Sequence, residues 1–232
     1  MKKFLIATVV LLGSITLANA EQYRAGISVM GAAFEADGAQ EVFSGSHSSN
    51  TTSTKRTIKA SDENDSAEGA FALASVFGEF VFNDQISLGV SYVPHSSDSE
   101  ATENKQNMHT TVTGEDSVST NSVKVSFEDL VTVYALANLN ENVYAKVGYM
   151  QVELITEEVL ATGGAYGDAT LDGYTIALGY NMDLADGMFV RAEAAYMEID
   201  GTTLTNTNDS TKSVSADGIT GYGAAVSVGK SF

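Results

Sequence analysis

The feature that most constrains this chain is a two-residue alternation of apolar and polar side chains, repeated in eight segments. A period of two places successive side chains on opposite faces of a β-strand, whereas an amphipathic helix needs a period near 3.6 residues. Each segment has about ten residues, the length of a tilted strand that crosses a membrane. The segments are residues 23–34, 69–82, 86–93, 127–138, 143–154, 170–182, 188–199 and 218–232. The sequence therefore predicts an all-β fold.

The connections between these segments alternate between short and long. Three are tight polar turns of the kind that close β-hairpins, at residues 83–85, 139–141 and 183–187. The other four are rich in Ser, Thr, Asn, Asp and Glu, and we predict them to be loops: 35–68, 94–126, 155–169 and 200–217. Short turns at one end and long loops at the other are typical of outer-membrane barrels, with the turns in the periplasm. An even strand number then places both ends of the mature chain on the periplasmic side.

A soluble β-sandwich would show the same alternation, but the placement of side-chain types favours a barrel in lipid. Aromatic side chains lie near strand ends, as in the aromatic girdles of membrane barrels, whereas a sandwich core would hold its largest residues mid-strand. The opposite faces are rich in Gly, Ala, Ser and Thr, which fit the narrow interior of an eight-stranded barrel. The aromatic residues are Tyr23, Phe80, Phe82, Tyr92, Tyr149, Tyr174, Tyr180, Tyr196, Tyr222 and Phe232.

Charged residues within the segments also keep to one face. Arg24, Glu79, Lys146, Arg191 and Glu193 all have the parity opposite to the aromatic residues. This parity avoids the cost of about 2–4 kcal/mol for an Arg or Lys that faces lipid at mid-depth. Glu79, Lys146 and Arg191 lie at similar distances from the short turns, so we predict that they meet across the lumen and specify register more than stability. The exceptions to the parity lie near strand ends, where the cost is small: Asp129, Glu153, Asp172 and Lys230.

The first twenty residues differ from the rest of the chain. Lys2 and Lys3 precede a short apolar run at residues 4–12, and small residues end at Ala20, before Glu21. This is the pattern of a secretory signal peptide, and the run is shorter than the roughly 20 apolar residues of a spanning helix. We predict a signal peptide at 1–20 and one barrel domain at 21–232.

Composition excludes several classes of protein. The sequence contains no cysteine, which excludes a lipid-anchored lipoprotein and a disulfide-stapled secreted domain. Its formal net charge of −18 argues against a nucleic-acid partner, because binding phosphate requires a basic surface. We also expect no cofactor, since no phosphate-cradling glycine loop stands between a strand and a helix.

The last segment ends on an aromatic residue, Phe232, after Val226 and Val228 on the same face. This ending resembles the C-terminal signal by which the outer-membrane assembly machinery recognises its clients. With the alternating segments and the charge parity, residues 21–232 resemble the small outer-membrane β-barrel family that includes the membrane domain of OmpA and OmpX. The resemblance implies an eight-stranded antiparallel up-and-down transmembrane β-barrel in the bacterial outer membrane. It also implies a monomer that contacts outer-membrane lipids, lipopolysaccharide and the assembly machinery.

Few residues suggest chemistry. His47, His95 and His109 all fall in predicted loops, and His95 is followed by two serines and Asp98. A hydrolase needs such groups held rigidly together, and a Ser-rich loop supplies them by composition alone. The acidic run at residues 62–65 offers oxygen ligands for Ca²⁺ but lacks the spacing and glycine of a known calcium loop. We therefore predict no catalytic and no metal-binding residues.

Three functions fit this interpretation. The leading hypothesis is a structural and surface-interaction protein whose rigid barrel carries acidic extracellular loops that contact an extracellular ligand, in envelope integrity, adhesion or as a surface antigen. The second is a narrow pore for ions or small solutes, although side chains fill an eight-stranded barrel. The third is an enzyme at the barrel rim that modifies lipids.

Overall fold

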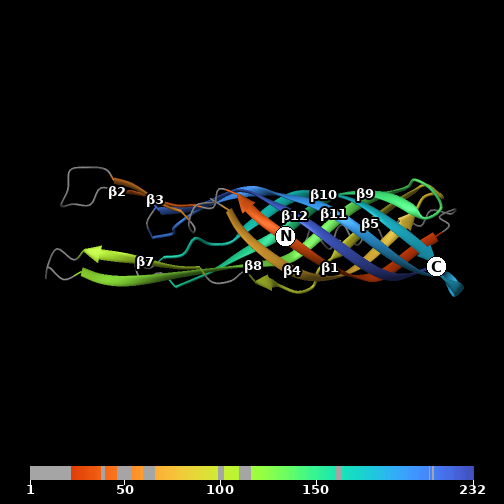
Figure 1. Cartoon of the computed structure of the whole chain (residues 1–232), viewed down its shortest axis with the longest axis horizontal. Helices are drawn as coiled ribbons and strands as arrows, with labels where there is room; N and C mark the ends of the chain where they lie inside the picture. The colour runs from red at the N-terminus through yellow and green to blue at the C-terminus, as the bar shows by residue number, and fades with distance from the viewer. Residues whose placement is uncertain are drawn as a thin grey trace.

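A computed structural model describes residues 22–37, 40–45, 54–59, 66–98, 102–109, 116–159, 164–208, 210 and 212–232 of the chain. Eight of its strands form a closed antiparallel wall in up-and-down order, and the last wall strand pairs with the first (Figure 1). The wall strands are β1 Gln22–Asp37, β4 Ser66–Val81, β5 Ile86–Tyr92, β8 Asp116–Asn138, β9 Val143–Val159, β10 Ala169–Asp183, β11 Met188–Thr205 and β12 Lys212–Ser231. The predicted eight-stranded antiparallel barrel is therefore confirmed.

The register of the pairs determines the shape of the wall. A path from Ala25 of β1 through successive paired residues of β4, β5, β8, β9, β10, β11 and β12 returns to β1 at Glu35, ten residues further along. Such a stagger is possible only if the strands tilt against the barrel axis. The result is a narrow barrel whose interior is filled by side chains.

Short turns and both described ends of the wall lie at the same end of the barrel. The turns join β4 to β5, β8 to β9 and β10 to β11, and the last of them contains the 3₁₀ turn η1, Ala185–Gly187. At this end the backbones of Tyr23 and Phe232 exchange two hydrogen bonds of 3.4 and 2.8 Å. Within the described part of the chain, no helix has the length and apolar character needed to cross a membrane.

The opposite end corrects the prediction that residues 35–68 and 94–126 are loops. Strands β2 Gln40–Gly45 and β3 Thr54–Lys59 form a hairpin, and β2 pairs with the first residues of β12. Strands β6 Ser97–Asp98 and β7 Thr102–His109 pair with β8 (Figure 1). Outside a membrane a ladder needs no lipid-facing row of apolar residues, so these strands lack the alternation that identifies strands within lipid.

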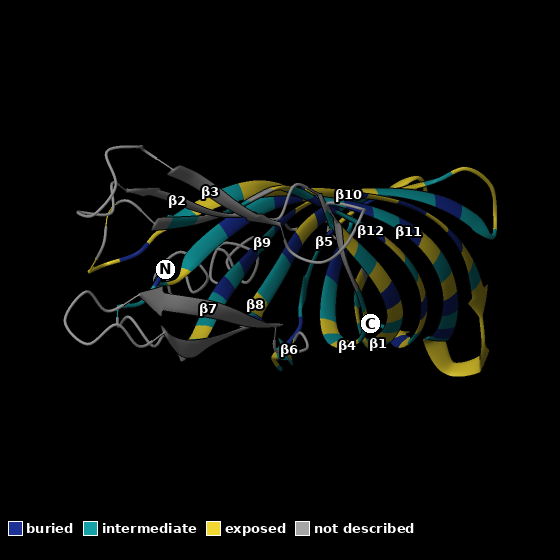
Figure 2. Ribbon diagram, turned by 60° about the vertical axis from the view of Figure 1, so that its left-hand side comes forward, coloured by how far each residue is buried: buried dark blue, intermediate teal, exposed yellow. Residues whose placement is uncertain are grey.

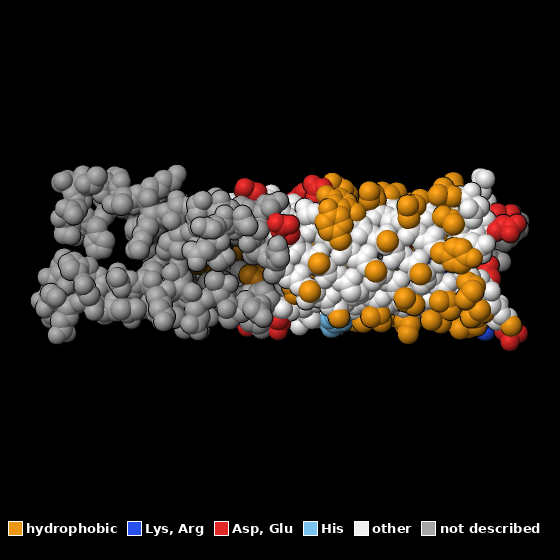
Figure 3. Space-filling view, in the orientation of Figure 1, with side chains coloured by type: hydrophobic (Ala, Val, Ile, Leu, Met, Phe, Trp, Pro, Cys, Tyr) orange, Lys and Arg blue, Asp and Glu red, His pale blue; other side chains and the backbone are white. Residues whose placement is uncertain are grey.

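Exposed and buried side chains alternate along the wall strands (Figure 2). Ile27, Val147 and Val226 are 62%, 57% and 58% exposed, although a sandwich core would bury them. Figure 3 shows exposed apolar side chains gathered over the turn-side part of the wall on the face in view, with acidic side chains at the borders of this band. An apolar band of this extent requires lipid around it, and closure satisfies the backbone groups within the wall. The molecule is a closed β-barrel whose apolar band is suited to a lipid bilayer.

Aromatic side chains mark both borders of the band. Near the short turns, the ring of Phe80 packs edge-on against Tyr23 and Phe82, with ring centroids 5.6 and 4.6 Å away. Toward the other border, Tyr149 pairs with Tyr174 across β9 and β10, and the rings of Tyr196 and Tyr222 lie 5.4 Å apart. Aromatic rings prefer such interfacial positions because one end is apolar and the other end is wet.

Strand β11 shows that the polarity of the wall inverts along its length. At the turn end, Arg191 is buried in the lumen and Ala192 is exposed to lipid. Further along, Met197 and Ile199 are buried in an apolar cluster, and Asp200 is exposed. The outer lumen is therefore lined mostly by large apolar residues, which corrects the prediction that small residues, Gly, Ala, Ser and Thr, dominate the lumen face. The cluster consists of Ala32, Met150, Val152, Leu154, Leu171, Met197, Ile199 and Ile219.

The apolar band predicts that a lysine is tolerated differently at two positions of similar exposure, one in the middle of the band and one in a short turn. Val147→Lys introduces an ammonium in mid-band and should cost about 2–4 kcal/mol, whereas the same charge near an interface costs about 0–1 kcal/mol. Leu139→Lys is the matched control, because Leu139 is 62% exposed in the turn between β8 and β9. We expect Leu139→Lys to show the mobility shift between unheated and boiled samples that marks a folded barrel, and Val147→Lys to lose it. Equal tolerance of both changes would contradict the position of the band.

Candidate functional site

The turn-side half of the lumen contains a buried ion pair between β4 and β11. Arg191 donates from Nη1 and Nη2 to Oε1 and Oε2 of Glu79, over 2.5 and 2.8 Å. The two side chains are 5% and 1% exposed. A bidentate pair fixes both the distance and the plane of its partners. Arg191 also donates from Nε to Oδ1 of Asn181 over 3.0 Å, so its orientation is held from a third strand.

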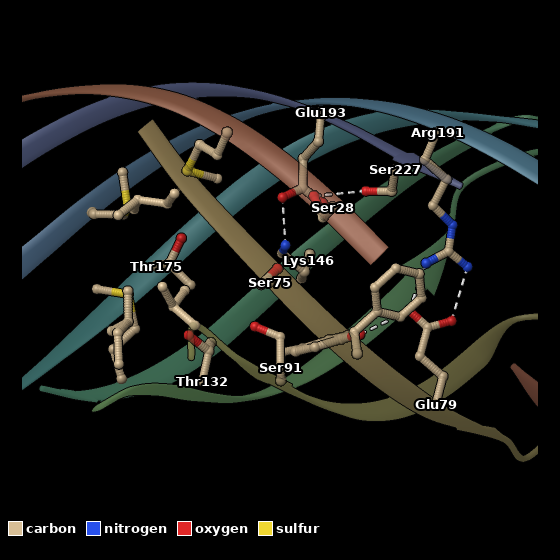
Figure 4. Close-up of a pocket in the computed structure, with 18 of the residues that line it drawn as sticks. Ser28, Ser75, Glu79, Ser91, Thr132, Lys146, Thr175, Arg191, Glu193 and Ser227 are labelled. Carbon is tan, nitrogen blue, oxygen red and sulfur yellow. Dashed lines mark hydrogen bonds and ion pairs between the residues drawn. The ribbon is translucent and has the colours of Figure 1, made fainter. Parts of the chain in front are cut away.

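A second ion pair lies in the same part of the lumen and joins Lys146 of β9 to Glu193 of β11 (Figure 4). Two tyrosine hydroxyls connect these carboxylates to the wall: Tyr134 donates to Glu79 over 2.9 Å and Tyr144 to Glu193 over 3.0 Å. The Lys146 ammonium lies 5.2 Å from the centroid of the Tyr134 ring. Lys146 thus pairs with Glu193, whereas Glu79 and Arg191 pair with one another.

Aromatic rings complete this layer around Arg191. Its guanidinium carbon lies 4.6, 5.4 and 5.8 Å from the ring centroids of Phe189, Tyr144 and Phe77. Such contacts between a cation and ring faces strengthen when water is excluded. Phe189 and Tyr144 are almost completely buried. Charged groups and rings therefore block the lumen at this level.

Two glycines leave the space that the tyrosine rings need. Gly89 pairs directly with Tyr134 across β5 and β8, and Gly179 pairs with Tyr144 across β10 and β9. A Cβ atom at either glycine would overlap the neighbouring tyrosine ring. The rings can therefore lie against the wall only where glycine stands opposite them.

The remaining predicted residues lie near the turn end. Arg24 is opposite Glu79 in register, and its guanidinium carbon lies 5.8 Å from the Phe189 ring centroid. Its Nε is buried without a hydrogen-bond partner, so Arg24 is in the lumen but belongs to neither ion pair. Phe232 is exposed at the turn end, with the Lys230 ammonium 5.7 Å from its ring centroid.

Beyond the ion pairs, the lumen holds a cavity of about 90 Å³. Its middle is lined by hydroxyl groups from six wall strands, and Ser227 donates to Ser28 over 2.9 Å (Figure 4). Met30, Met150 and Met197 line its outer side. A polar cavity of this size has room for water molecules that bond to the hydroxyls. The hydroxyl residues are Ser28, Ser75, Ser91, Thr132, Thr175 and Ser227.

The residues considered for rim chemistry do not form a hydrolytic arrangement. His95 accepts a hydrogen bond at Nε2 from the backbone N–H of Ala74 over 2.9 Å, and its Nδ1 lies 3.0 Å from the backbone oxygen of Ser96. Asp98 accepts a hydrogen bond from Ser126 over 2.7 Å. Both ring nitrogens of His95 are thus engaged by backbone, whereas a general base needs one nitrogen directed at a nucleophile.

Of the other two histidines and the acidic run, the structure describes only His109. His109 lies in strand β7, which corrects its placement in a loop. His47 and residues 62–65 lie outside the described residues. Where the structure describes side chains, no three His, Asp or Glu residues gather as ligands for a metal ion.

Tyrosine hydroxyls donate hydrogen bonds to carboxylates that lie on the lipid-side face, unlike the charged residues of the lumen. Asp129 accepts a hydrogen bond from Tyr92 over 2.6 Å, and Asp172 accepts from Tyr149 and from Gln151 over 2.5 and 3.0 Å. Glu198 is bound in the same way by Tyr174 and Tyr196. A row of tyrosine and carboxylate groups thus forms the outer border of the apolar band.

Comparison with known proteins identifies similar barrels. The solid-state NMR structure of AlkL has 10% sequence identity and a TM-score of 0.47, covering 92% of this chain and 91% of that one. OprG from Pseudomonas aeruginosa has 9% identity and a TM-score of 0.45, covering 92% and 96%. The outer membrane protease OmpT from Escherichia coli has 13% identity and a TM-score of 0.42, covering 94% and 99%. No protein-family model and no curated protein sequence matches the chain. At such low identity, these barrels do not identify its function.

The sequence interpretation omitted the aromatic part of the lumen. Tyr144 lies two residues before Lys146 in β9, and Phe189 lies two residues before Arg191 in β11, so each ring has the parity of a charged residue. The predicted lumen network contained only charged residues, although parity with a neighbouring charge also indicates the lumen for these aromatic residues. That signal would have identified Phe77, Tyr144 and Phe189.

The ion pair between Glu79 and Arg191 predicts a non-additive effect on stability. Arg191→Met leaves a buried carboxylate without its cation and should destabilise the barrel by about 3–5 kcal/mol. Glu79→Leu combined with Arg191→Met removes both charges and should recover most of that loss. Urea unfolding in lipid vesicles, followed by circular dichroism, measures both variants. If the double variant is as unstable as Arg191→Met, the loss does not arise from an unpaired charge.

Proposed function

We propose that the protein is a structural and surface-interaction protein of the outer membrane, in which the barrel is an anchor and the extracellular strands are the interacting part. The observation that carries this proposal is the layer of two ion pairs and four aromatic rings across the lumen. A barrel blocked in this way is a rigid support, and function then belongs to the segments that it carries.

The extension of the wall beyond the apolar band supports this proposal. Strand β8 has 23 residues and β12 has 20, about twice the length of a membrane-crossing strand. They carry the β7–β8 and β2–β3 hairpins away from the lipid surface (Figure 1). Outside the band the exposed residues include Asp200 and Asp217, in a chain of net charge −18. Such a surface favours basic partners, or lipopolysaccharide through divalent cations.

The same proposal includes partners of the barrel itself. Outer-membrane lipids surround the apolar band, and the assembly machinery binds β12 together with Phe232, which follows it. The protein acts as a monomer, since β12 pairs with β1 and the wall therefore closes within one chain.

Replacing a hairpin without changing the barrel tests the surface role. In the test variant, residues 102–123 are replaced by an Asn-Gly turn, which should leave the membrane part folded. Cells that produce the full chain should clump or adhere more than cells that produce the variant, while both proteins keep the heat-dependent mobility shift. Equal clumping and adherence of the two strains, at equal surface amounts, would contradict a role for this hairpin.

A narrow pore is the second candidate, because hydroxyl groups line a cavity within the lumen. The purified protein in planar bilayers distinguishes the two functions. We expect no steady single-channel current, since the charged and aromatic layer separates the cavity from the turn end of the lumen. A steady current that scales with the number of inserted molecules would favour the pore over the anchor.

A further inference from the structure

The barrel wall has a seam beside the outer half of β4. Strand β4 pairs with β1 along residues 66–81 but with β5 only along residues 76–81. β5 ends at Tyr92, just before Pro94, and β6 then pairs with β8 and not with β4. Among the described residues, therefore, no strand pairs with the β5-side edge of β4 between residues 66 and 75. This edge leaves backbone donors that need other partners.

At the start of this seam, the imidazole of His95 accepts a backbone hydrogen bond from β4 that a neighbouring strand would otherwise accept. The backbone N–H of Ala74, two residues beyond the last paired residue Val76, donates to Nε2 of His95 over 2.9 Å. The other ring nitrogen, Nδ1, lies 3.0 Å from the backbone oxygen of Ser96, which can only accept. This geometry requires neutral His95 with its proton on Nδ1 and a lone pair on Nε2.

Behind the imidazole, the two sides of the seam meet through apolar side chains. The rings of Phe71 on β4 and Phe127 on β8 lie 6.2 Å apart, edge to face. Leu73 of β4 and Leu130 of β8 both line the cavity in the lumen. These contacts carry no backbone hydrogen bond across the seam, so His95 supplies the polar connection at its edge.

We propose that His95 is a pH-sensitive latch: when neutral it closes this seam, and when protonated it releases the β5-side edge of β4, which stays paired with β1. Protonation places a hydrogen on Nε2, which then cannot accept the Ala74 N–H, so the connection is lost when the imidazole gains its charge. On the strands beside His95, the titratable residues nearest in sequence or register are Tyr92 of β5, Asp98 of β6, and Glu128 and Asp129 of β8. The β4 segment 69–76 contains none. Asp98 and Asp129 already accept hydroxyl hydrogen bonds, and they would attract an imidazolium away from β4.

The amide of Ala74 measures the latch directly. In the ¹⁵N-labelled full chain in nanodiscs, hydrogen exchange at pH 8 and pH 5, corrected for intrinsic rates, should show protection of Ala74 falling about two- to tenfold at pH 5, the range set by one hydrogen bond. The amide of Gly78, within the paired part of β4, is the internal control and should keep its protection. Unchanged Ala74 protection would overturn the proposal.

Three variants separate the latch from general loosening of the barrel. His95→Ala should lower Ala74 protection at both pH values, and His95→Gln, whose amide oxygen accepts at any pH, should remove the pH dependence. His47→Ala with His109→Ala should keep the wild-type response, because these are the other two histidines of the chain. If the pH dependence persists in His95→Gln, or disappears in the double variant, His95 is not the latch. Should His95→Ala fail to fold, His95→Gln still decides the question.

Opening of the seam can be followed as a distance, since the chain has no native cysteine. Spin labels on Ala72→Cys and Ser97→Cys report the separation of β4 and β6 across the seam. We expect the separation to lengthen or broaden at pH 5 in the wild-type background but not in His95→Gln. An identical distribution at both pH values would show that the seam stays closed without the imidazole bond.

Discussion

The structure depends on one constraint: within lipid, each backbone N–H and C=O must find its partner inside the protein. Closure of β12 onto β1 satisfies this constraint around the whole band, and the stagger of ten residues sets the tilt that makes closure possible. The only proline, Pro94, stands just after β5, where a missing N–H costs no bond of the central ladder. The seam beside β4 begins where this strand ends, toward the outer border of the band.

The second consequence of the lipid environment is the inversion of polarity along the wall. Within the band, lipid takes the apolar side chains and the lumen must hold the charges, as Val147 and Lys146 show on β9. Beyond the tyrosine row, water surrounds the wall, so the apolar side chains turn inward, and Val152 and Leu154 are buried while Glu153 has the outward parity. The part of the barrel beyond the apolar band is thus built like a soluble barrel, with an apolar core. Tyrosine hydroxyls bound to Asp129, Asp172 and Glu198 join the two parts.

The sequence allowed prediction of the strands and their lipid face because lipid imposes a strict period of two. Each predicted segment corresponds to a wall strand, and the short turns lie where the polar turn segments indicated. The same reasoning failed for β2, β3 and β7, where no lipid enforces alternation, and for the outer lumen, where the lining is apolar. It also could not assign partners in the lumen, since parity states which face a charge occupies but not which strand faces it. The pairing of Lys146 with Glu193 depends on tilt and stagger, which only the full register provides.

The ion pairs and the glycine–tyrosine pairs fix the register between neighbouring strands, which the alternation of side chains does not fix by itself. A slip of one residue between neighbouring strands turns every apolar side chain toward the lumen and every charge toward lipid, so parity alone opposes it. A slip of two residues preserves parity and would cost little in an evenly patterned wall. Here it would place Ser87 or Ser91 opposite Tyr134 in place of Gly89, where a side chain overlaps the ring. It would also separate the carboxylate of Glu79 from the guanidinium of Arg191, leaving both charges buried and unpaired. The costly groups in the lumen therefore select one register among those that the lipid would accept.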